Sequence, residues 1–427
     1  MCKAGPAARA ETAVKHNKIL QFGEGVFLRG FPDALVERMN RESDFHGEVY
    51  AVKPRPGAVQ EAFAAQDCRY HLLVRGVADD GTLVERLEEI TSLKRVYSSS
   101  DEWGEIEKLA ADPELRFVFS NTTEAGIAYD ENNPDTFPGK LARLLRKRFQ
   151  AGLPGVVVLP FELIEHNGET LRNYVLRYLA GEPAAEYVRK ECRFFDTLVD
   201  RIVSGFPADA AQFDPDDRLM VAAEPFAFLA LQAPEALREI LPLPADTVFC
   251  VPDIAPYRTR KVRLLNASHT AMVAGGLLAG FQEVGELLET PVFRKRIEST
   301  LYDEILPTVP LPEREKRSFA DAVLRRFANP FAHHKLASIA LNSAAKWRVR
   351  VLPVILDSAV LPRYLARSFG ELYSYYRRSG AAGDTAAVAA RFAGEYPFEA
   401  FLSDRELWGM DLSSIPGFAD AAREALQ

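Results

Sequence analysis

The chain has 427 residues, of which 48% are hydrophobic, 26% charged and 10% aromatic. This length and composition are typical of a globular protein with two domains and exclude disordered, collagen-like and disulfide-scaffold proteins. The 52 Lys and Arg residues against 60 Asp and Glu give a formal net charge of −8, and no long basic run interrupts this balance. We therefore expect no nucleic-acid partner and no binding to an anionic membrane.

The cysteines and the termini indicate the compartment. Cys2, Cys68, Cys192 and Cys250 lie far apart without a CxxC pair, which predicts reduced thiols rather than disulfides or a zinc site. The first 17 residues lack the apolar stretch of a secretory signal, and no segment approaches the roughly 18 apolar residues of a membrane span. We expect a cytoplasmic protein that works as a monomer or a small homo-oligomer.

The first half of the chain alternates short apolar runs with helical patterns. Runs of strand length occupy 18–23, 48–53, 115–120 and 155–161, and amphipathic patterns occupy 31–40 and 140–149. Because the runs are apolar throughout, they predict strands buried on both faces of a parallel sheet covered by helices. Two later runs, at 218–223 and 247–252, are expected to complete or edge the same sheet.

Helical spacing dominates the remainder of the chain. It is found in the following segments: 261–281, 293–306, 317–330, 335–347 and 385–396. The sequence thus predicts an α/β domain over residues 1–252, followed by a mostly α-helical domain over residues 253–427.

A glycine-containing loop follows the first predicted strand. In GEGVFLRGF, Gly23 and Gly25 would allow a tight turn and a close approach of the backbone to a pyrophosphate at a helix N-terminus. Leu28 occupies the place of the third glycine of a G-x-G-x-x-G motif, and Gly30 follows two residues later. An ordinary turn between a strand and a helix would also explain the pattern. Its position within a β–α–β unit favours a Rossmann-type dinucleotide site.

The second predicted strand ends where such folds recognise the ribose. An acidic residue there would bind the ribose hydroxyls of NAD, whereas Lys53 and Arg55 could hold a 2′-phosphate. The spacing alone leaves the preference between NAD and NADP open.

Small polar residues follow the run at 115–120. Asn121, Thr122, Thr123, Glu124 and Gly126 come directly after this strand, and ligands of parallel sheets bind at the carboxyl ends of the strands. The segment suits the ribose and carboxamide of a nicotinamide. Capping of a helix by Asn121 or Thr123 is an alternative, and the two functions are compatible.

Three polar side chains share the apolar face of a predicted helix at 261–272. At about 100° per residue, His269 lies about 80° and Asn266 about 140° from Lys261. Their arc also holds four apolar residues: Val262, Leu265, Met272 and Val273. Since burying a lysine, an amide and an imidazole costs several kcal/mol unless each finds a partner, a substrate-binding cleft is the favoured explanation; a satisfied core histidine and a snorkelling lysine are the alternatives.

These three groups suit the reduction of a carbonyl. Hydride transfer to a ketone leaves an alkoxide, which needs a proton donor and fixed hydrogen-bond donors. Lys261 could donate the proton if burial brought its pKa from about 10.4 towards 7 to 8. Asn266 and His269 would then donate hydrogen bonds to the reacting oxygen.

With these motifs, the sequence resembles the polyol-specific long-chain dehydrogenases, or mannitol dehydrogenase family. The resemblance covers nearly the whole chain and includes five segments in order: QFGEGVFLRGF, NTTEAG, FPGKL (137–141), LVDRI (198–202) and KVRLLNASH. Within the family, these segments are most similar to those of members that act on the sugar acids of hexuronate breakdown. The resemblance implies a soluble oxidoreductase that uses NAD and a sugar-acid substrate, with no catalytic metal.

The resemblance also implies roles for individual residues. Lys261 would be the general acid/base, with Asn266 and His269 polarising the reacting oxygen. Asp200 and Lys346 would contact the substrate. The cofactor would be bound by the following residues: Gly23, Gly25, Phe27, Arg29, Asn121, Thr122 and Glu124.

Two positions depart from mannitol-type members. An asparagine that helps to bind the reacting oxygen there is replaced within 161–168, where Glu162 is the candidate on the substrate side. An arginine eight residues before Lys346 is Ser338 here, which argues against a simple polyol substrate. Four residues are then candidates to face a substrate carboxylate: His333, His334, Lys335 and Arg348. A solvated surface position is the alternative for each.

Overall fold

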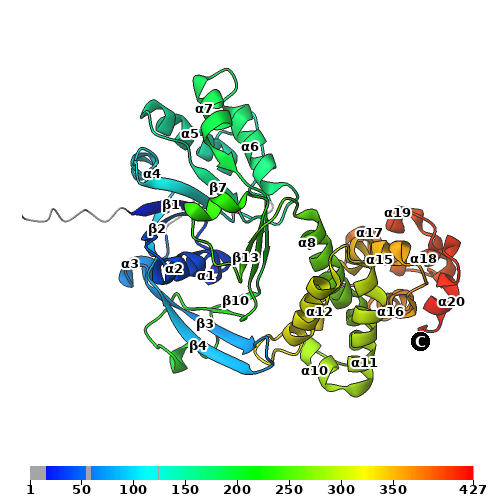
Figure 1. Cartoon of the computed structure of the whole chain (residues 1–427). Helices are drawn as coiled ribbons and strands as arrows, with labels where there is room; N and C mark the ends of the chain where they lie inside the picture. The colour runs from blue at the N-terminus through cyan, green and yellow to red at the C-terminus, as the bar shows by residue number, and fades with distance from the viewer. Residues whose placement is uncertain (1–15, 54–58, 124, 427) are drawn as a thin grey trace, which may run out of the picture. The chain divides into compact units, whose positions relative to one another are not determined.

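The computed structural model describes residues 16–53, 59–123 and 125–426, which form two compact units (Figure 1). Unit 1 contains residues up to Leu73, Leu87–Ala223 and Ala227–Pro252. Unit 2 contains Val74–Arg86, Glu224–Phe226 and the chain from Asp253 onwards. Short pieces from the first half of the chain therefore belong to the unit that is formed mainly by the second half.

A six-stranded parallel sheet is the centre of unit 1. Its strands run in the order β5-β2-β1-β6-β7-β8, and each neighbouring pair is parallel. Their bounds are as follows: β1 Asn17–Phe22, β2 Gly47–Lys53, β5 Leu93–Ser98, β6 Leu115–Ser120, β7 Val157–Pro160 and β8 Arg193–Phe194. This order confirms the predicted Rossmann-type fold, with the switch point between β1 and β6.

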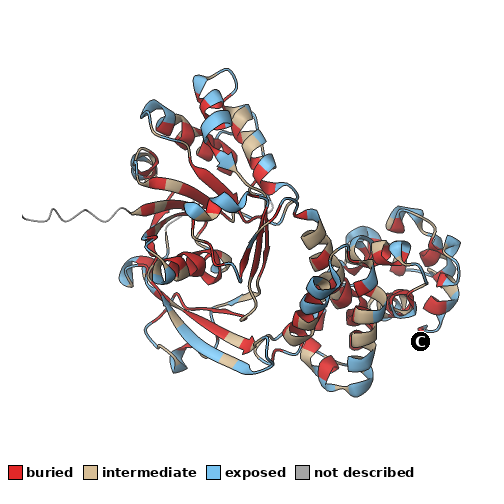
Figure 2. Cartoon of the chain, in the orientation of Figure 1, coloured by how far each residue is buried: buried red, intermediate tan, exposed pale blue. Residues whose placement is uncertain are grey.

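Helices cover the sheet with their apolar faces, as the buried positions in Figure 2 show. The longer helices are α2 Pro32–Glu42, α4 Trp103–Ala110, α5 Phe137–Gln150, α6 Asn167–Tyr178 and α7 Pro183–Glu191, and the short ones are α1 Val26–Gly30 and α3 Glu61–Ala65. On α5, Leu141, Leu144 and Leu145 are buried at helical spacing and join the same core as Phe22 and Val158. This packing stabilises the sheet because it removes apolar surface from water on both faces.

The prediction that the runs at 218–223 and 247–252 join the parallel sheet is wrong. β11 (Val221–Ala223) pairs antiparallel with β10 (Val203–Gly205) in a second sheet of order β10-β11-β3-β4, where β3 is Tyr70–Val77 and β4 is Leu83–Ile90. β13 (Val248–Cys250) lies in a third sheet with β12 (Phe228–Leu231) and β9 (Thr197–Asp200).

Unit 2 from Asp253 onwards is helical, as predicted. Its α-helices are α8 Ala255–Arg260, α9 Ser268–Leu278, α10 Val284–Glu289, α11 Pro291–Ser299, α12 Glu313–Phe327, α13 Leu336–Ile339, α14 Ser343–Lys346, α15 Leu352–Asp357, α16 Arg363–Ser379, α17 Ala386–Phe392, α18 Phe398–Ser403, α19 Arg405–Trp408 and α20 Phe418–Arg423. Their shared core includes Trp347, Phe369, Phe401 and Trp408, whose rings pack mainly edge to face.

Three segments of unit 2 are π-helical instead of α-helical. They are η3 (Lys261–Ala267), η4 (Thr300–Ile305) and η6 (Trp347–Val351), and η3 packs against both of the others. π-helical turns are rare and occur often at functional sites. The predicted catalytic segment therefore has a different helical geometry from the one that its apolar spacing indicates.

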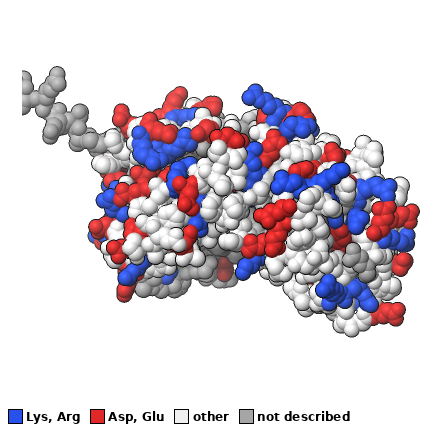
Figure 3. All heavy atoms as spheres, turned by 90° about the horizontal axis from the view of Figure 1, so that it is seen from below, with Lys and Arg blue, Asp and Glu red and all other residues white. Residues whose placement is uncertain are grey.

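The helices and the surface charges of the described residues have the following character. Within the described ranges, no helix has the length and apolar character to cross a bilayer. On the face seen in Figure 3, basic and acidic side chains alternate in small clusters.

Candidate active site

The loop after β1 has the geometry that a dinucleotide requires. Gly23 has φ +121°, and a Cβ there would lie 2.7 Å from Leu28 Cδ1 and 3.1 Å from the Asn121 carbonyl oxygen. Gly25 is the N-cap of α1, and a Cβ built on it would meet nothing within 4 Å. Gly23 is thus needed for the turn itself, while Gly25 leaves open space in front of backbone N–H groups. This is the arrangement that accepts a phosphate.

Gly30 provides the close packing that the third glycine of the motif usually allows. A Cβ on Gly30 would lie 2.6 Å from Val203 Cγ1 in β10. Leu28, which stands at the usual position of that glycine, is buried and contacts the Gly23 turn. The shift of two residues therefore keeps the function of the glycine but moves it to another strand.

Phe27 and Arg29 occupy different environments on α1. Phe27 is half-buried, with its ring edge to face against Phe31 at 6.0 Å. The Arg29 guanidinium is buried, donates to the Leu219 carbonyl and lies 5.6 Å from the centroid of the Tyr70 ring. Burial lowers the pKa of Arg29. This orientation makes Arg29 part of the packing beneath the loop, and its predicted contact with the cofactor stays a prediction.

A buried carboxyl lies beside Arg29. Tyr70 Oη is 2.9 Å from the Arg29 carbonyl oxygen and 3.2 Å from Asp33 Oδ2. The Tyr70 hydroxyl is the donor in both contacts. Burial raises the pKa of Asp33 to about 7, although the hydrogen bonds from Gln21 and Tyr70 act in the opposite direction.

The loop after β6 is held by Glu162. The Thr122 N–H and hydroxyl donate to Glu162 Oε1 at 2.8 and 2.9 Å, and the Ser120 hydroxyl donates to Oε2 at 2.9 Å. Glu162 is 2% exposed, and burial raises the pKa of its carboxyl. Asn121 is fixed separately, since its amide donates to the Phe161 carbonyl at 2.8 Å. Glu162 therefore positions the loop, whereas the sequence places it on the substrate side.

The alternative that this loop caps a helix is wrong for Asn121 and Thr123. The described residues of the segment are not helical, and Thr123 has φ +79°. The next helix, α5, begins at Phe137 and is capped by Thr136, whose hydroxyl accepts from the Gly139 N–H at 3.2 Å. Glu124, and likewise Arg55, lies outside the described residues.

Asp200 lies at the end of β9, opposite Phe228 of β12, and is 4% exposed. Both its strand and its partner strand belong to unit 1. A carboxylate at this depth is retained in proteins when it has a specific partner or function. Its contact with the substrate remains a prediction.

The π-helix η3 changes the geometry of the catalytic segment. In a π-helix each backbone N–H donates to the carbonyl five residues earlier, so a turn of η3 holds more residues than an α-helical turn. The angle between Lys261 and Asn266 therefore differs from the value of about 140° in an α-helix. His269 follows in α9, three residues after Asn266. All three side chains are half-buried. The catalytic role of the three residues stays a prediction.

The His269 imidazole is held by packing. Its ring stacks on Phe327 at 4.3 Å and meets the His334 ring edge to face at 5.8 Å. Nε2 is buried and has no hydrogen-bond partner among the described residues. Burial, with His334 and Arg326 nearby, holds the pKa of His269 well below its usual value. A neutral imidazole with a free buried nitrogen suits hydrogen bonding to a ligand oxygen.

Cationic side chains surround this imidazole. Lys346 and Arg350 both contribute to lowering its pKa. Lys346 Nζ donates to the Ile339 carbonyl at 2.9 Å, and Arg350 Nη1 lies 3.5 Å from Thr270 Oγ1. Sequence reasoning missed Arg350, because its proximity to His269 depends on the packing of η6 against η3 and α9.

Three of the four residues predicted to face a substrate carboxylate are exposed, and the fourth is half-buried. His333 is exposed and pairs with Glu283 at 3.2 Å, and Lys335 is exposed. Arg348 is exposed, with Nη1 3.4 Å from the Leu407 carbonyl oxygen. His334 is half-buried against His269.

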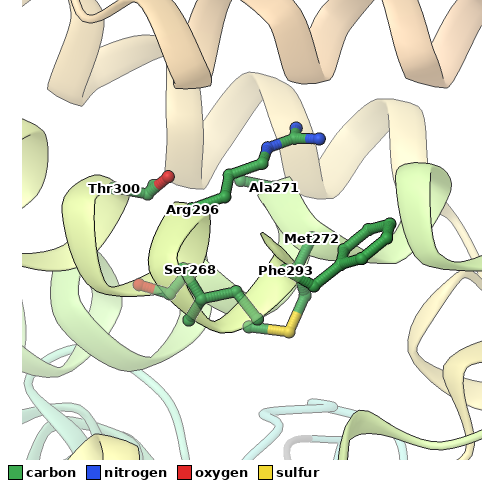
Figure 4. A pocket seen from close by; sticks show the side chains of 7 residues that line it. Ser268, Ala271, Met272, Phe293, Arg296 and Thr300 are labelled. Atoms are coloured by element: carbon green, nitrogen blue, oxygen red, sulfur yellow. The ribbon is translucent and has the colours of Figure 1, made fainter. Parts of the chain in front are cut away.

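A small cavity borders the same helix but not the trio. It lies between α9, α11 and η4, and Figure 4 shows the side chains that line it: Ser268, Ala271, Met272, Phe293, Arg296 and Thr300. Its volume of about 10 Å³ suffices for about one water molecule. This cavity is too small for a sugar. The described residues also hold no group of three His, Cys, Asp or Glu side chains placed to bind a metal ion.

Comparisons with known proteins extend over the whole chain. The sequence is 40% identical to an altronate oxidoreductase from Cronobacter sakazakii, over 94% of this chain and 92% of the relative. It is 36% identical to one from Halalkalibacterium halodurans, over 96% of this chain and 90% of the relative.

Two solved structures share the fold. Pseudomonas fluorescens mannitol 2-dehydrogenase, in a ternary complex with NAD and D-mannitol, is 21% identical with a TM-score of 0.71, over 96% of this chain and 91% of that one. D-sorbitol dehydrogenase in substrate-free form is 22% identical with a TM-score of 0.77, over 96% and 92%.

Two family domains match in succession. Residues 17–243 match the mannitol dehydrogenase Rossmann domain, and residues 253–427 match the mannitol dehydrogenase C-terminal domain. Together with the full-length relatives, these matches show that the chain belongs to the mannitol dehydrogenase family.

Proposed function

We propose that this protein is an NAD-dependent tagaturonate reductase, which interconverts D-tagaturonate and D-altronate in hexuronate breakdown. The observation that carries the proposal is the similarity to altronate oxidoreductases over nearly the whole chain. Lys261 and Asn266 in the π-helical segment η3, with His269 in the helix that follows it, support the proposal. In this proposal residues 1–252 bind the dinucleotide and residues 253–427 supply the catalytic and substrate-binding groups. The reduced cysteines Cys68, Cys192 and Cys250 support a cytoplasmic location for a monomer or small homo-oligomer.

The residues after β1 and β6 fit NAD. Open space in front of Gly25 would accept the pyrophosphate at the N-terminus of α1. Asn121 and Thr122, which Glu162 and the Phe161 carbonyl hold in place, would bind the nicotinamide side. Phe27 and Glu124 are further predicted contacts of the cofactor. When bound, the reduced nicotinamide supplies the hydride.

The trio in unit 2 would manage the charge and the proton. The Lys261 ammonium donates a proton to the substrate oxygen as negative charge develops there. The Asn266 amide and His269 Nε2–H donate hydrogen bonds to the same oxygen, and because His269 is neutral it donates without itself delivering a proton. In the oxidation direction Lys261 accepts the proton. Asp200 and Lys346 would hold the remainder of the substrate chain.

Replacing Lys261 tests this assignment. Lys261→Met should lower kcat by about a thousandfold, because general acid catalysis contributes roughly 10²–10⁴, while the Kd for NADH stays within twofold. Lys295→Met, at an exposed lysine of α11, is the matched control and should retain wild-type kcat. An unchanged kcat in Lys261→Met, or a matching loss of NADH binding, contradicts the catalytic role and would favour a non-catalytic dinucleotide-binding homologue.

Substrate and cofactor are tested side by side on the wild-type protein. We expect reduction of tagaturonate with NADH at a kcat/KM well above that for fructuronate or fructose. Preference for fructuronate would indicate a fructuronate reductase, and activity on fructose alone a mannitol dehydrogenase. A strong preference for NADPH would overturn the cofactor assignment.

A further inference from the structure

Arg350 is an arginine without an acidic partner in the helical core of unit 2. It is half-buried in η6 (Trp347–Val351), and its hydrogen bond to Thr270 Oγ1 is long, at 3.5 Å. No carboxylate of the described residues forms an ion pair with it, and desolvation alone lowers its pKa. Burying a guanidinium without an anion is unfavourable, so this arrangement calls for an anion from outside the chain.

Three other arginines of unit 2 that are buried or partly buried have acidic partners. Arg296 pairs with Glu371, and Arg263 pairs with Asp357. Arg326 forms a two-point contact with Glu224 at 2.9 and 3.0 Å, where both side chains are under 5% exposed. The chain therefore neutralises its buried guanidinium groups with acids at these positions but not at Arg350.

The location of Arg350 connects it to the proposed chemistry. Its contact, Thr270, directly follows His269, and the Thr270 hydroxyl donates to the Asn266 carbonyl at 2.8 Å. Arg350 also lies close enough to His269 and Lys346 to lower the pKa of both. The guanidinium is thus beside the trio but is not part of it.

We propose that Arg350 binds the carboxylate of the substrate and so selects a sugar acid over a neutral sugar. This inference rests on the proposed function. In a ketohexuronate the ketone and the carboxylate stand towards opposite ends of the carbon chain, so one molecule can place its ketone at Lys261 and its carboxylate at a separate cation. A planar guanidinium can bind both carboxylate oxygens. Lys346, with one donor already used on the Ile339 carbonyl, adds positive charge beside it.

The direct test compares an acid with its neutral counterpart. The substrates are tagaturonate and the ketohexose in which CH₂OH replaces the carboxylate. Arg350→Gln should lower kcat/KM for tagaturonate by about 100-fold, mostly through KM, and change kcat/KM for the ketohexose by less than about threefold. Arg350→Lys should fall between, because it keeps the charge but not the two-point contact.

Arg348→Gln is the matched control. Arg348 lies two residues away on the same π-helical segment, but its guanidinium is exposed near the Leu407 carbonyl. Its replacement should leave the preference for the acid unchanged. Loss of that preference in Arg348→Gln, with retention in Arg350→Gln, would overturn the inference and assign the carboxylate to Arg348.

Rescue separates recognition from a structural effect. Adding guanidinium ion at millimolar concentration to Arg350→Ala should lower the KM for tagaturonate at least fivefold, and it should not do so in Arg348→Ala. An equal loss of kcat/KM for acid and neutral sugar without rescue, or a wild-type KM in Arg350→Gln, overturns the role of Arg350 while the proposed function stands. A wild-type protein that reduces no ketohexuronate refutes the proposed function itself.

Discussion

Replacing Asp33 by asparagine should stabilise unit 1 at neutral and alkaline pH. Asp33 is fully buried, and burial raises the pKa of its carboxyl from 3.8 to about 7. A raised pKa means that the folded state favours the protonated form, so stability is greatest below the unfolded pKa and falls as the pH rises through the folded value. Asparagine keeps an uncharged oxygen that accepts from the Tyr70 hydroxyl, and it removes this titration.

The magnitude follows from the size of the shift. A rise from 3.8 to about 7 is about three pK units, which corresponds to about 4 kcal/mol lost across the full titration. Integrating the same two values between pH 5 and pH 8 gives an advantage of Asp33→Asn over wild type that grows by roughly 2.5 kcal/mol. Above pH 8 the advantage should level off, because the carboxyl is then ionised in both states.

Hydrogen exchange of peptides from β1 and β2, corrected for the intrinsic exchange rate, measures the opening free energy of unit 1 by itself. Asp44→Asn is the control, because Asp44 is exposed just after α2, and it should show the wild-type pH dependence. A constant difference between Asp33→Asn and wild type from pH 5 to pH 8 would refute the reasoning and show that Asp33 is charged in the folded protein.

Three further predictions concern the loops after β1 and β6 and the Glu224–Arg326 ion pair of unit 2. Glu162→Ala removes the acceptor of the Thr122 N–H and of the Ser120 and Thr122 hydroxyls. It should lower kcat/KM for NADH by about 30-fold, which corresponds to about 2 kcal/mol. Wild-type kinetics in this variant would show that Glu162 does not position the loop. Gly25→Val should keep the thermal stability but raise the Kd for NADH at least tenfold, measured by fluorescence titration, because its side chain fills open space. Gly23→Ala should instead cost about 1–3 kcal/mol of stability at φ +121°; the reverse pattern would contradict the assigned glycine functions. Glu224→Gln should destabilise unit 2 by about 3–5 kcal/mol, because it removes the charge that neutralises the buried Arg326 guanidinium. Glu313→Gln, on the exposed side of α12, is the control and should leave the stability unchanged. Hydrogen exchange of α12 peptides measures the difference between the two variants.

The strands that could be predicted are those with an unbroken apolar sequence. Four such strands lie in the parallel sheet: β1, β2, β6 and β7. Because both faces of this sheet are covered, the apolar sequence of each strand is enough to predict it. β5 (Leu93–Ser98) belongs to the same sheet but contains exposed Lys94 and Arg95, and β4 is largely exposed. Such strands are determined by their neighbours in the sheet, which a single sequence does not display.

The residues of the candidate site also divide into those that the sequence could predict and those that it could not. Gly23, Gly25 and the Lys261 trio were predictable because turn geometry and buried polar groups leave local signals. The position of Glu162 under the loop was not, since a contact across 40 residues joins it to Thr122. Arg350 was also missed, because the sequence shows that it is an arginine but not that it is half-buried beside Thr270.

The π-helical geometry of η3 determines the angle between the side chains of Lys261 and Asn266. Lys261 and Asn266 are five residues apart, which would separate them by about 140° in an α-helix. The wider turns of η3 give the two residues a different angle. A π-helical turn is less favourable than an α-helical one and persists where its surroundings impose it. Here η3 packs between η4 and η6, which are π-helical themselves. We therefore expect η4 and η6 to stabilise the backbone that carries Lys261 and Asn266.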